Sequence, residues 1–382
     1  MSKHSNNDGA LVVLEDGRCF TGESFGAPGT AFGEAVFSTG MTGYQETLTD
    51  PSYHKQVVVM TAPQIGNTGW NAQDNESRRI WVSGFIIRDL TGITSSWRAT
   101  GTLDKELASQ GIVAVQGIDT RALTRHLRER GAMRVGLFTG DDAERPREEL
   151  IAMVNAQPRM AGADLAGEVT TTEPYIVDAE GEKRFTVAAI DLGIKSRTPE
   201  QLATRGIEVH VLPATATMDD VRATRPDGIF FSNGPGDPAA ADHTVALLRQ
   251  ALDAGLPVFG ICFGNQILGR ALGFGTYKLK YGHRGINVPV RDNATGRIEI
   301  TSQNHGFAVD APLDGPTDTP YGRVEVSHVC VNDNVVEGLR CLDIPAFSVQ
   351  YHPEAAAGPH DADYLFDRFA DMMASQKETP NA

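Results

Sequence analysis

The chain has 382 residues, of which 41% are apolar and 22% are charged, and its formal net charge at pH 7 is −15. This composition is typical of a globular protein, and the length predicts two domains because single hydrophobic cores stop growing at roughly 250–300 residues. The negative charge argues against nucleic acid or an anionic membrane as a partner, since both would repel the chain.

The four cysteines are scattered and show no CxxC spacing, which argues against a disulfide framework and against a zinc site. They are Cys19, Cys262, Cys330 and Cys341. Residues 1–10 are polar and lack the apolar segment of a signal peptide, so they predict a loose tail. The longest apolar runs have the length of a strand and are too short to cross a membrane. We therefore expect a soluble protein of the reducing cytoplasm with no metal site in this chain.

The N-terminal half predicts short strands separated by Gly, Pro and Asp turns. The expected strands are Ala10–Leu14, Glu34–Ser38, Val57–Thr61, Gly84–Ile87 and Met133–Phe138. A helix should begin at Asp119 or Thr120 as N-cap and end at Gly131, with Leu123 and Leu127 on one face.

A further helix is predicted over Pro146–Asn155, and the polar, turn-prone segment Thr170–Glu182 is the predicted linker. The domain boundary is therefore expected near Lys183, which gives domains 1–182 and 183–382.

After the linker, strands alternate with helices. The expected strands are Val187–Leu192, Ile207–Leu212, Gly228–Ser232 and Pro257–Ile261, and the expected helices are Pro199–Arg205, Met218–Thr224, Asp242–Ala254 and Asn265–Leu272. Such alternation predicts a doubly wound parallel sheet and hence an α/β fold. Hairpin-like strands, a last strand and a closing helix follow: Arg297–Thr301, Val324–Cys330, Val335–Arg340, Ala346–Tyr351 and Tyr364–Met373.

Cys262 stands between two glycines in the sequence Gly260-Ile-Cys-Phe-Gly264. This spacing is typical of a nucleophile elbow, a sharp turn from a strand into a helix that places a nucleophile at the turn. The N-terminal end of the following helix favours a thiolate, and the N–H of Phe263 is predicted to face an oxyanion. The alternative is that Cys262 is a small buried core residue.

His352-Pro353-Glu354 follows the last predicted strand. In an extended segment, residues i and i+2 lie on one face, so Glu354 can accept from one ring nitrogen of His352 while the other nitrogen faces a thiol. The alternative is an ordinary surface or core histidine.

Two glycine-containing segments each have a plain structural alternative. Residues 233–238, Asn-Gly-Pro-Gly-Asp-Pro, follow a strand and can bring backbone N–H groups close to a ligand as a second oxyanion donor, but they also suit a simple turn. Residues 303–307, Gln-Asn-His-Gly-Phe, are equally compatible with a loop.

The elbow, the 233–238 loop and the His-Pro-Glu motif together resemble class I, or triad, glutamine amidotransferases from about Lys183 to the C-terminus. Further motifs resemble the small, glutaminase subunit family of carbamoyl-phosphate synthases along almost the whole chain. They are Phe37–Tyr53, Ile118–Gly131, Lys280–Asn287, Gln303–Asp310 and Pro353–Asp361. The resemblance implies an N-terminal α/β small-subunit domain, which we expect to dock the partner, and a C-terminal amidotransferase domain.

By this resemblance Cys262 is the nucleophile, His352 the base and Glu354 the third triad member, and L-glutamine is hydrolysed through a γ-glutamyl thioester. The glutamine-contacting positions that the resemblance implies are Gly40, Gly234, Gly236, Phe263, Gln266, Asn304, Gly306 and Phe307. The chain departs from the family pattern at Gly40, where many members have Ser, at Asn265, where many have His, and at Tyr351, where many have Gly. The serine hydroxyl contact is lost at Gly40, so any role there is left to the backbone.

The resemblance also implies a large synthetase subunit that receives ammonia and holds the ATP and Mg²⁺ sites, with no cofactor in this chain. The product would serve arginine and pyrimidine synthesis, and a higher oligomer of heterodimers is possible. Two other hypotheses stay open: a free-standing cysteine hydrolase acting on a peptide or γ-glutamyl bond, and a non-catalytic scaffold. The intact triad disfavours the scaffold.

Overall fold

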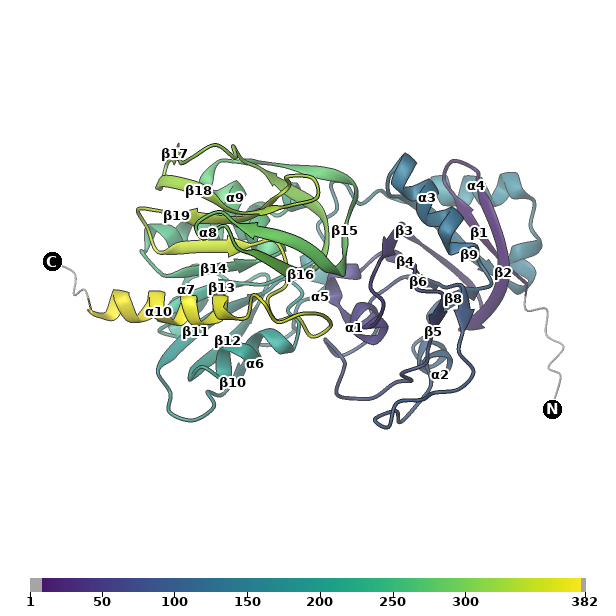
Figure 1. Cartoon of the computed structure of the whole chain (residues 1–382), viewed down its shortest axis with the longest axis horizontal. Coiled ribbons are helices and arrows are strands. Elements are labelled where there is room, and N and C mark those ends of the chain that lie inside the picture. Colours follow the sequence, from purple (N-terminus) through teal and green to yellow (C-terminus); the bar gives the residue numbers. More distant parts are fainter. Residues whose placement is uncertain (1–8, 379–382) are drawn as a thin grey trace. The chain divides into compact units, whose positions relative to one another are not determined.

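The computed structural model describes residues 9–378, which divide into two compact units (Figure 1). The first unit contains residues 9–160 and the short segment Lys280–Arg284, and the second contains residues 161–279 and 285–378. Residues 1–8 of the predicted tail lie outside the described residues, and Gly9 and Ala10 belong to the first strand.

The first unit is built on a closed β-barrel with the strand order β1-β2-β8-β6-β4-β3-β9. Its strands are β1 (Gly9–Leu14), β2 (Cys19–Gly26), β3 (Thr30–Ser38), β4 (Gln56–Met60), β6 (Gly84–Ile86), β8 (Val113–Gln116) and β9 (Met133–Thr139). The run from β3 through β4 and β6 to β8 is parallel, and the other neighbours are antiparallel. A separate parallel pair joins β5 (Gln64–Ile65) to β7 (Asp89–Leu90).

Helices pack against this barrel. They are α1 (Tyr44–Thr49), α2 (Leu103–Ser109), α3 (Thr120–Arg130) and α4 (Arg147–Asn155), with the 3₁₀ turns η1 (Pro51–Tyr53) and η2 (Gly140–Glu144). The limits predicted for α3 are confirmed: the Asp119 side chain accepts from Ala122 N at 2.9 Å, and Gly131 ends the helix with φ = +100°. Such a φ is easy for glycine and costly for other residues.

Strand β1 shows why the barrel needs a helix outside it. Val12 and Leu14 pack into the barrel interior, while the alternating Leu11 and Val13 pack under α4 against Leu150. Alternate residues of a strand point to opposite faces, so both faces of β1 are buried.

The second unit contains one mixed sheet with the strand order β10-β12-β11-β13-β14-β20-β19-β18-β15-β16, and β17 pairs with β18 beside this path. Its strands are β10 (Tyr175–Val177), β11 (Phe185–Asp191), β12 (Ile207–Pro213), β13 (Gly228–Phe231), β14 (Val258–Ile261), β15 (Gly275–Asp292), β16 (Ile298–Asp310), β17 (Thr317–Thr319), β18 (Gly322–Cys330), β19 (Val336–Cys341) and β20 (Ala346–Val349). The run β12-β11-β13-β14-β20 is parallel, which confirms the predicted doubly wound sheet.

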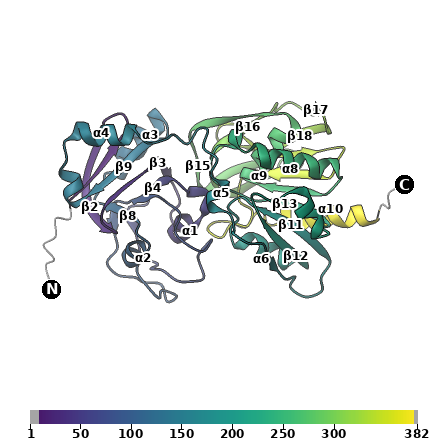
Figure 2. The same cartoon turned by 180° about the vertical axis from the view of Figure 1, so that it is seen from behind.

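Helices lie on both faces of this parallel run (Figure 2). They are α6 (Arg197–Ala203), α7 (Met218–Ala223), α8 (Asp242–Asp253), α9 (Phe263–Leu272) and α10 (Tyr364–Glu378), with the 3₁₀ turn η3 (Pro238–Ala240). Leu248 of α8 and Ile267 of α9 pack in one apolar cluster, and Phe366 of α10 packs in the cluster on the other side. The α/β class is therefore confirmed. Because β14 and β20 pair in parallel, the carboxyl end of β20 at Val349 lies beside the carboxyl end of β14 at Ile261.

The predicted linker Thr170–Glu182 contains β10 and follows the short helix α5 (Ala166–Val169). Strand β10 pairs antiparallel with β12, and the Thr170 hydroxyl accepts from Ala214 N at 2.9 Å. The segment is thus packed onto the second unit, and the division between the units comes after Met160, earlier in the chain than the expected boundary near Lys183. Among residues 9–378, no helix has both the length and the apolar character needed to cross a membrane.

Candidate active site

The turn at Cys262 joins strand β14 to helix α9. Cys262 has φ = +56° and ψ = −101°, a strained backbone conformation for a residue with a side chain. Its N–H donates to Val349 O of β20 at 2.8 Å, and this bond fixes the turn at the carboxyl ends of two parallel strands. The strand-to-helix elbow that the sequence predicts is present.

Close backbone packing explains the two glycines of the elbow. A Cβ on Gly264 would lie 2.2 Å from Phe231 O, and a Cβ on Gly260 would lie 2.7 Å from the Gly264 backbone. Real Cβ atoms do not approach a backbone atom so closely, so glycine at both positions lets the helix start directly against strand β13.

His352 and Glu354 lie just after β20 and point toward each other. Nδ1 of His352 is 2.8 Å from Oε1 of Glu354, and the two side chains are 2% and 0% exposed. The predicted pairing of the imidazole with the carboxylate is therefore present in the structure. The same Glu354 oxygen is also 2.8 Å from Nζ of Lys195, a residue that follows β11 and that the sequence argument missed.

The charges in this group shift each other's pKa. Burial alone lowers the pKa of His352, but the Glu354 carboxylate and the Cys262 sulfur outweigh it and raise that pKa to about 10. Burial alone raises the pKa of Glu354, but Lys195 and His352 together hold it far below its ordinary value. A buried carboxylate between two cations stays ionised, so the imidazole is favoured in its protonated form.

The thiol and the imidazole face the same space. Sγ of Cys262 is 3.6 Å from Asn304 O, within range for a thiol donor, and the side chain is 2% exposed. Nε2 of His352 is buried and makes no conventional hydrogen bond among the described residues, while the Cys262 sulfur is near enough to raise the pKa of this imidazole. The ring nitrogen that is left without a partner is the one that catalysis would need to exchange a proton with sulfur.

Helix α9 and strand β16 place four of the predicted glutamine-contacting residues beside the elbow. Gln266 Nε2 donates to Phe307 O at 2.9 Å, and the Asn304 carbonyl faces Cys262. Gly306 lies between Asn304 and Phe307 in β16, so residues 303–307, for which the sequence offered a loop as the alternative, belong to a strand.

A second residue that the sequence argument missed, Gln350, connects the elbow to the last parallel strand. Its Oε1 accepts from Asn265 Nδ2 at 3.0 Å and from Gln266 Nε2 at 3.2 Å. Asn265 Oδ1 in turn accepts from the Ser348 hydroxyl at 2.8 Å. Asn265 is thus a buried residue whose side-chain nitrogen and oxygen are both hydrogen-bonded.

The loop of residues 233–238 lies directly against the elbow, because Gly264 N donates to Ser232 O at 3.1 Å. A Cβ on Gly234 would lie 2.2 Å from Leu192 O, and Gly236 has φ = +100°. Packing alone therefore requires glycine at both positions, and a contact with substrate remains a separate prediction.

The remaining predicted contact, Gly40, belongs to the first unit and follows β3. It is buried, and its N–H donates to the Ser38 hydroxyl at 3.4 Å. Its contact with glutamine stays a prediction.

Comparison with known proteins separates the same two parts of the chain. Residues 12–137 match the family described as carbamoyl-phosphate synthase small chain, CPSase domain, and residues 188–372 match glutamine amidotransferase class-I. A carbamoyl phosphate synthase small chain of Streptomyces coelicolor is 70% identical over 96% of this chain and 97% of its own. The protein of the same name from Mycobacterium tuberculosis (strain CDC 1551) is 63% identical over 96% of this chain and 99% of its own. That from Corynebacterium glutamicum is 57% identical over 98% of this chain and 95% of its own.

The chain belongs to the carbamoyl phosphate synthase small-chain family. The amidotransferase match includes Cys262, His352 and Glu354, and also Lys195. The small-chain match lies within the barrel unit.

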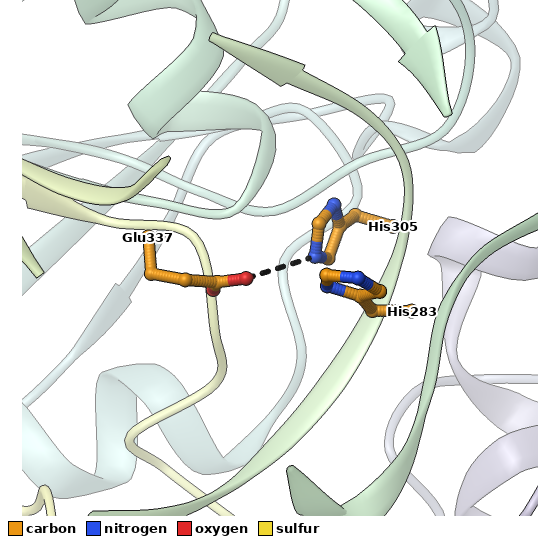
Figure 3. A group of neighbouring side chains, drawn as sticks. All are labelled: His283, His305 and Glu337. Carbon is orange, nitrogen blue, oxygen red and sulfur yellow. Dashed lines mark ion pairs between the residues drawn. The ribbon is translucent and has the colours of Figure 1, made fainter. Parts of the chain in front are cut away.

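One further ion pair of this small chain lies next to the glutamine positions in sequence. His305 Nδ1 donates to Phe307 O at 2.8 Å, its Nε2 donates to Gln303 Oε1 at 3.1 Å, and Nε2 is 3.7 Å from Glu337 Oε1 (Figure 3). Gln303 Nε2 donates to the other Glu337 oxygen at 3.1 Å, which fixes the orientation of this amide. Both ring nitrogens of His305 therefore face oxygen atoms of its neighbours.

Proposed function

We propose that this small chain hydrolyses L-glutamine at Cys262 and supplies ammonia to a large synthetase subunit that makes carbamoyl phosphate from bicarbonate and ATP. The observation that carries the proposal is the strained elbow cysteine facing Nε2 of His352, whose other nitrogen is paired with Glu354. A nucleophile, a base and an orienting carboxylate are the parts that acyl transfer from an amide needs.

In the proposed first step, Cys262 attacks as the thiolate, because its proton is already held on Nε2 of the protonated His352, and Sγ forms a bond to Cδ of the glutamine side chain. The electron pair of the C=O bond moves onto oxygen. The backbone N–H of Phe263 would stabilise this oxyanion, because the first residue of α9 has no acceptor for its N–H inside the helix.

His352 then gives the proton to the amide nitrogen as the C–N bond breaks, which releases ammonia and leaves a γ-glutamyl thioester on Cys262. Water attacks the thioester with His352 as general base, and the products are glutamate and the free thiol. Glu354 keeps one imidazole nitrogen protonated and turned away from sulfur throughout, and Lys195 positions Glu354.

The glutamine would lie along the elbow, β16 and the 233–238 loop. Gln266, Asn304, Gly306 and Phe307 are proposed to contact it from one side, and Gly234 and Gly236 from the other through backbone groups. Phe263 and Gly40 complete the proposed set.

The proposal assigns the ATP and Mg²⁺ chemistry to the large subunit and needs no cofactor in this chain. It also places the protein in the cytoplasm, in arginine and pyrimidine synthesis, as part of a heterodimer that can form larger assemblies. The name small chain, shared by the relatives, supports a larger partner.

The test is Cys262→Ser in the reconstituted complex. We expect glutamine-dependent carbamoyl phosphate synthesis to be abolished and ammonia-dependent synthesis to be retained, because the thiol serves only ammonia release. Cys19→Ser, at a half-buried cysteine of the first unit, is the matched control and should retain both activities. A loss of both activities in Cys262→Ser contradicts the proposed division of labour.

A further inference from the structure

The side-chain amide of Gln266 is held by two acceptors beside the elbow. Gln266 N donates to Cys262 O at 3.2 Å, so the first turn of α9 places Gln266 directly beyond Cys262. Nε2 of Gln266 donates to Phe307 O at 2.9 Å and to Gln350 Oε1 at 3.2 Å. An amide nitrogen carries two hydrogens, so both donors of this nitrogen are used.

The Phe307 carbonyl fixes which way the Gln266 amide points. A backbone carbonyl only accepts hydrogen bonds, so Nε2 of Gln266, and not Oε1, must face it. The nitrogen therefore lies toward Phe307 and Gln350, and Oε1 of Gln266 points away from them. Within residues 9–378 no hydrogen bond to Gln266 Oε1 is present, so this oxygen is left for a group that the described chain does not supply.

The orientation of the Gln350 amide follows from that of Gln266. Because Nε2 of Gln266 donates, the Gln350 atom that meets it must be the oxygen. This oxygen also accepts from Asn265 Nδ2 at 3.0 Å, and Asn265 Oδ1 accepts from the Ser348 hydroxyl at 2.8 Å. One backbone carbonyl thus sets the orientation of the amides of Gln266, Gln350 and Asn265.

Gln350 keeps this arrangement although the other half of its own amide is unused. Its side chain is fully buried, and its Nε2 has no hydrogen-bond partner in the part of the chain that the structure describes. A buried donor without a partner costs stability. An apolar side chain of similar size has no such donor, but it also lacks the oxygen that receives the N–H groups of Asn265 and Gln266.

We propose that Gln350 is a positioning residue that holds Gln266 Oε1 in the direction of the substrate. The proposal rests on the proposed function, in which Gln266 contacts L-glutamine. With Phe307 O as its single acceptor, the Gln266 amide could turn about that hydrogen bond, and the second acceptor on Gln350 removes this freedom before the substrate arrives. A contact group that is already oriented loses less entropy on binding, so the substrate binds more tightly.

The chemistry of an amide oxygen decides which kinetic constant this positioning affects. Gln266 Oε1 accepts hydrogen bonds and has no hydrogen to donate, so it cannot stabilise the oxyanion of the transition state. Its contact with the substrate is therefore made equally in the ground state and the transition state. Loss of such a contact raises KM and leaves kcat unchanged.

The experiment measures kcat and KM for glutamine hydrolysis by the full-length chain in complex with the large subunit. We expect Gln350→Met to raise KM about tenfold with kcat within about twofold of wild type, and Gln266→Met to raise KM at least as much. Because Gln350 acts through Gln266, the double variant should match Gln266→Met within about twofold, whereas independent effects would multiply.

Two further variants separate position from fold. Gln350→Glu keeps an oxygen toward Gln266 in either protonation state, so its KM should stay within about threefold of wild type. Gln56→Met is the matched control, since Gln56 is a buried glutamine of the barrel strand β4 whose Nε2 donates to Glu34 Oε2 at 3.5 Å and whose Oε1 has no partner in residues 9–378. It should leave kcat and KM within about twofold of wild type.

A folded Gln350→Met enzyme with an unchanged KM overturns the positioning role, and so does a double variant whose increase in KM is the product of the two single increases. If Gln350→Met does not fold, Gln350→Glu decides: a KM near that of wild type supports the proposal, and a rise of about tenfold despite the retained oxygen overturns it. A wild-type complex that releases no glutamate from glutamine overturns the proposed function itself, a result distinct from the others because they all leave wild-type hydrolysis intact.

Discussion

One carboxylate oxygen, Oε1 of Glu354, receives both Nδ1 of His352 and Nζ of Lys195 at 2.8 Å. Glu354 is fully buried, so its charge would be costly without cations close by. Lys195 supplies a second cation to the carboxylate, while the other ring nitrogen of His352 is not used by Glu354. This makes Lys195 a positioning residue, one step removed from the chemistry.

Replacing Lys195 should therefore impair hydrolysis and also shift its pH dependence. We expect Lys195→Met to lower kcat for glutamine hydrolysis by roughly 10²-fold, because general acid–base catalysis contributes about that much or more and depends on the imidazole direction. Lys195 lowers the pKa of His352, so its removal should move the pH profile of kcat/KM toward higher pH.

The matched control for that measurement is Lys183→Met. Lys183 forms a lysine–glutamate pair of similar length in the second unit, 2.6 Å to Glu208, but its side chain is 49% exposed. The Lys183→Met substitution should leave the pH profile of kcat/KM unchanged. A Lys195→Met enzyme with lower kcat and an unmoved pH profile would limit Lys195 to a general structural role.

The charged pair also makes stability depend on pH in a defined window. The folded pKa of His352 is raised from 6.5 to about 10, so its contribution is complete below pH 6.5 and is lost as pH rises toward 10. The folded pKa of Glu354 is lowered from 4.5, so its contribution is present above pH 4.5 and is lost as pH falls.

We therefore expect Glu354→Gln to lower the melting temperature most between pH 4.5 and 6.5, and the difference from wild type to shrink on both sides of that window. Thermal unfolding of the two proteins across pH 3.5–10.5 checks this. Glu208→Gln, at the exposed pair, should show a small difference. A constant difference at every pH would mean that the effect of Glu354 is one of shape and has no ionic component.

At this scale the sequence predicted the residues that stand in motifs and missed those that do not. Cys262, His352 and Glu354 were found because elbow glycines and a two-residue spacing imply geometry. Lys195 and Gln350 carry no such spacing. They reach the site only because β11, β14 and β20 lie parallel in one sheet and end at the same edge.

At the scale of elements, the elbow is a very tight junction of the second unit, because α9 starts against the backbone of β13. We expect Gly264→Ala to lower the free energy of unfolding by about 3 kcal/mol, since overpacking against a backbone oxygen at 2.2 Å forces a backbone shift. Urea denaturation measures this change.

Gly167→Ala is the control for the elbow substitution. Gly167 lies in helix α5 of the same unit, and a Cβ there would meet nothing within 4 Å. Its free energy of unfolding should stay within about 0.5 kcal/mol of wild type. Equal effects at both glycines would show that the close approach at Gly264 is relieved at little cost.

Elements with a clear hydrophobic pattern were predicted and those without one were not. Strands β11 to β14 and helix α8 were found because they are apolar or amphipathic throughout. Strand β15 was missed because its 18 residues are mostly polar and half-exposed, and β16 was only partly expected because Asn304 and Gly306 favour loops. In these strands the pairing with neighbours decides the structure and local preference does not.

At the scale of the whole molecule, the closed barrel was not foreseen, because closure depends on β1 pairing with β9 across more than a hundred residues. The division between the units comes after Met160, because the segment that was expected to be a linker adds β10 to the edge of the second sheet, and three strand residues between polar neighbours give little sign of that pairing. Long-range pairing of this kind leaves only weak traces in local sequence.

The triad is almost inaccessible as it stands: Cys262 and His352 are 2% exposed and Glu354 is 0% exposed. Glutamine must reach Sγ, so hydrolysis requires an opening motion, and a partner that binds the open form better shifts the population toward it.

We expect the purified large subunit to raise kcat for glutamine hydrolysis by this chain at least about tenfold, which corresponds to a differential affinity of about 1.4 kcal/mol. Steady-state glutamate release with and without the large subunit measures the effect, and Cys262→Ser should give no release in either case. If the isolated chain hydrolysed glutamine at the full rate and the large subunit did not change that rate, a free-standing cysteine hydrolase would be favoured. A site that stays closed until the partner binds is expected only of a glutaminase subunit.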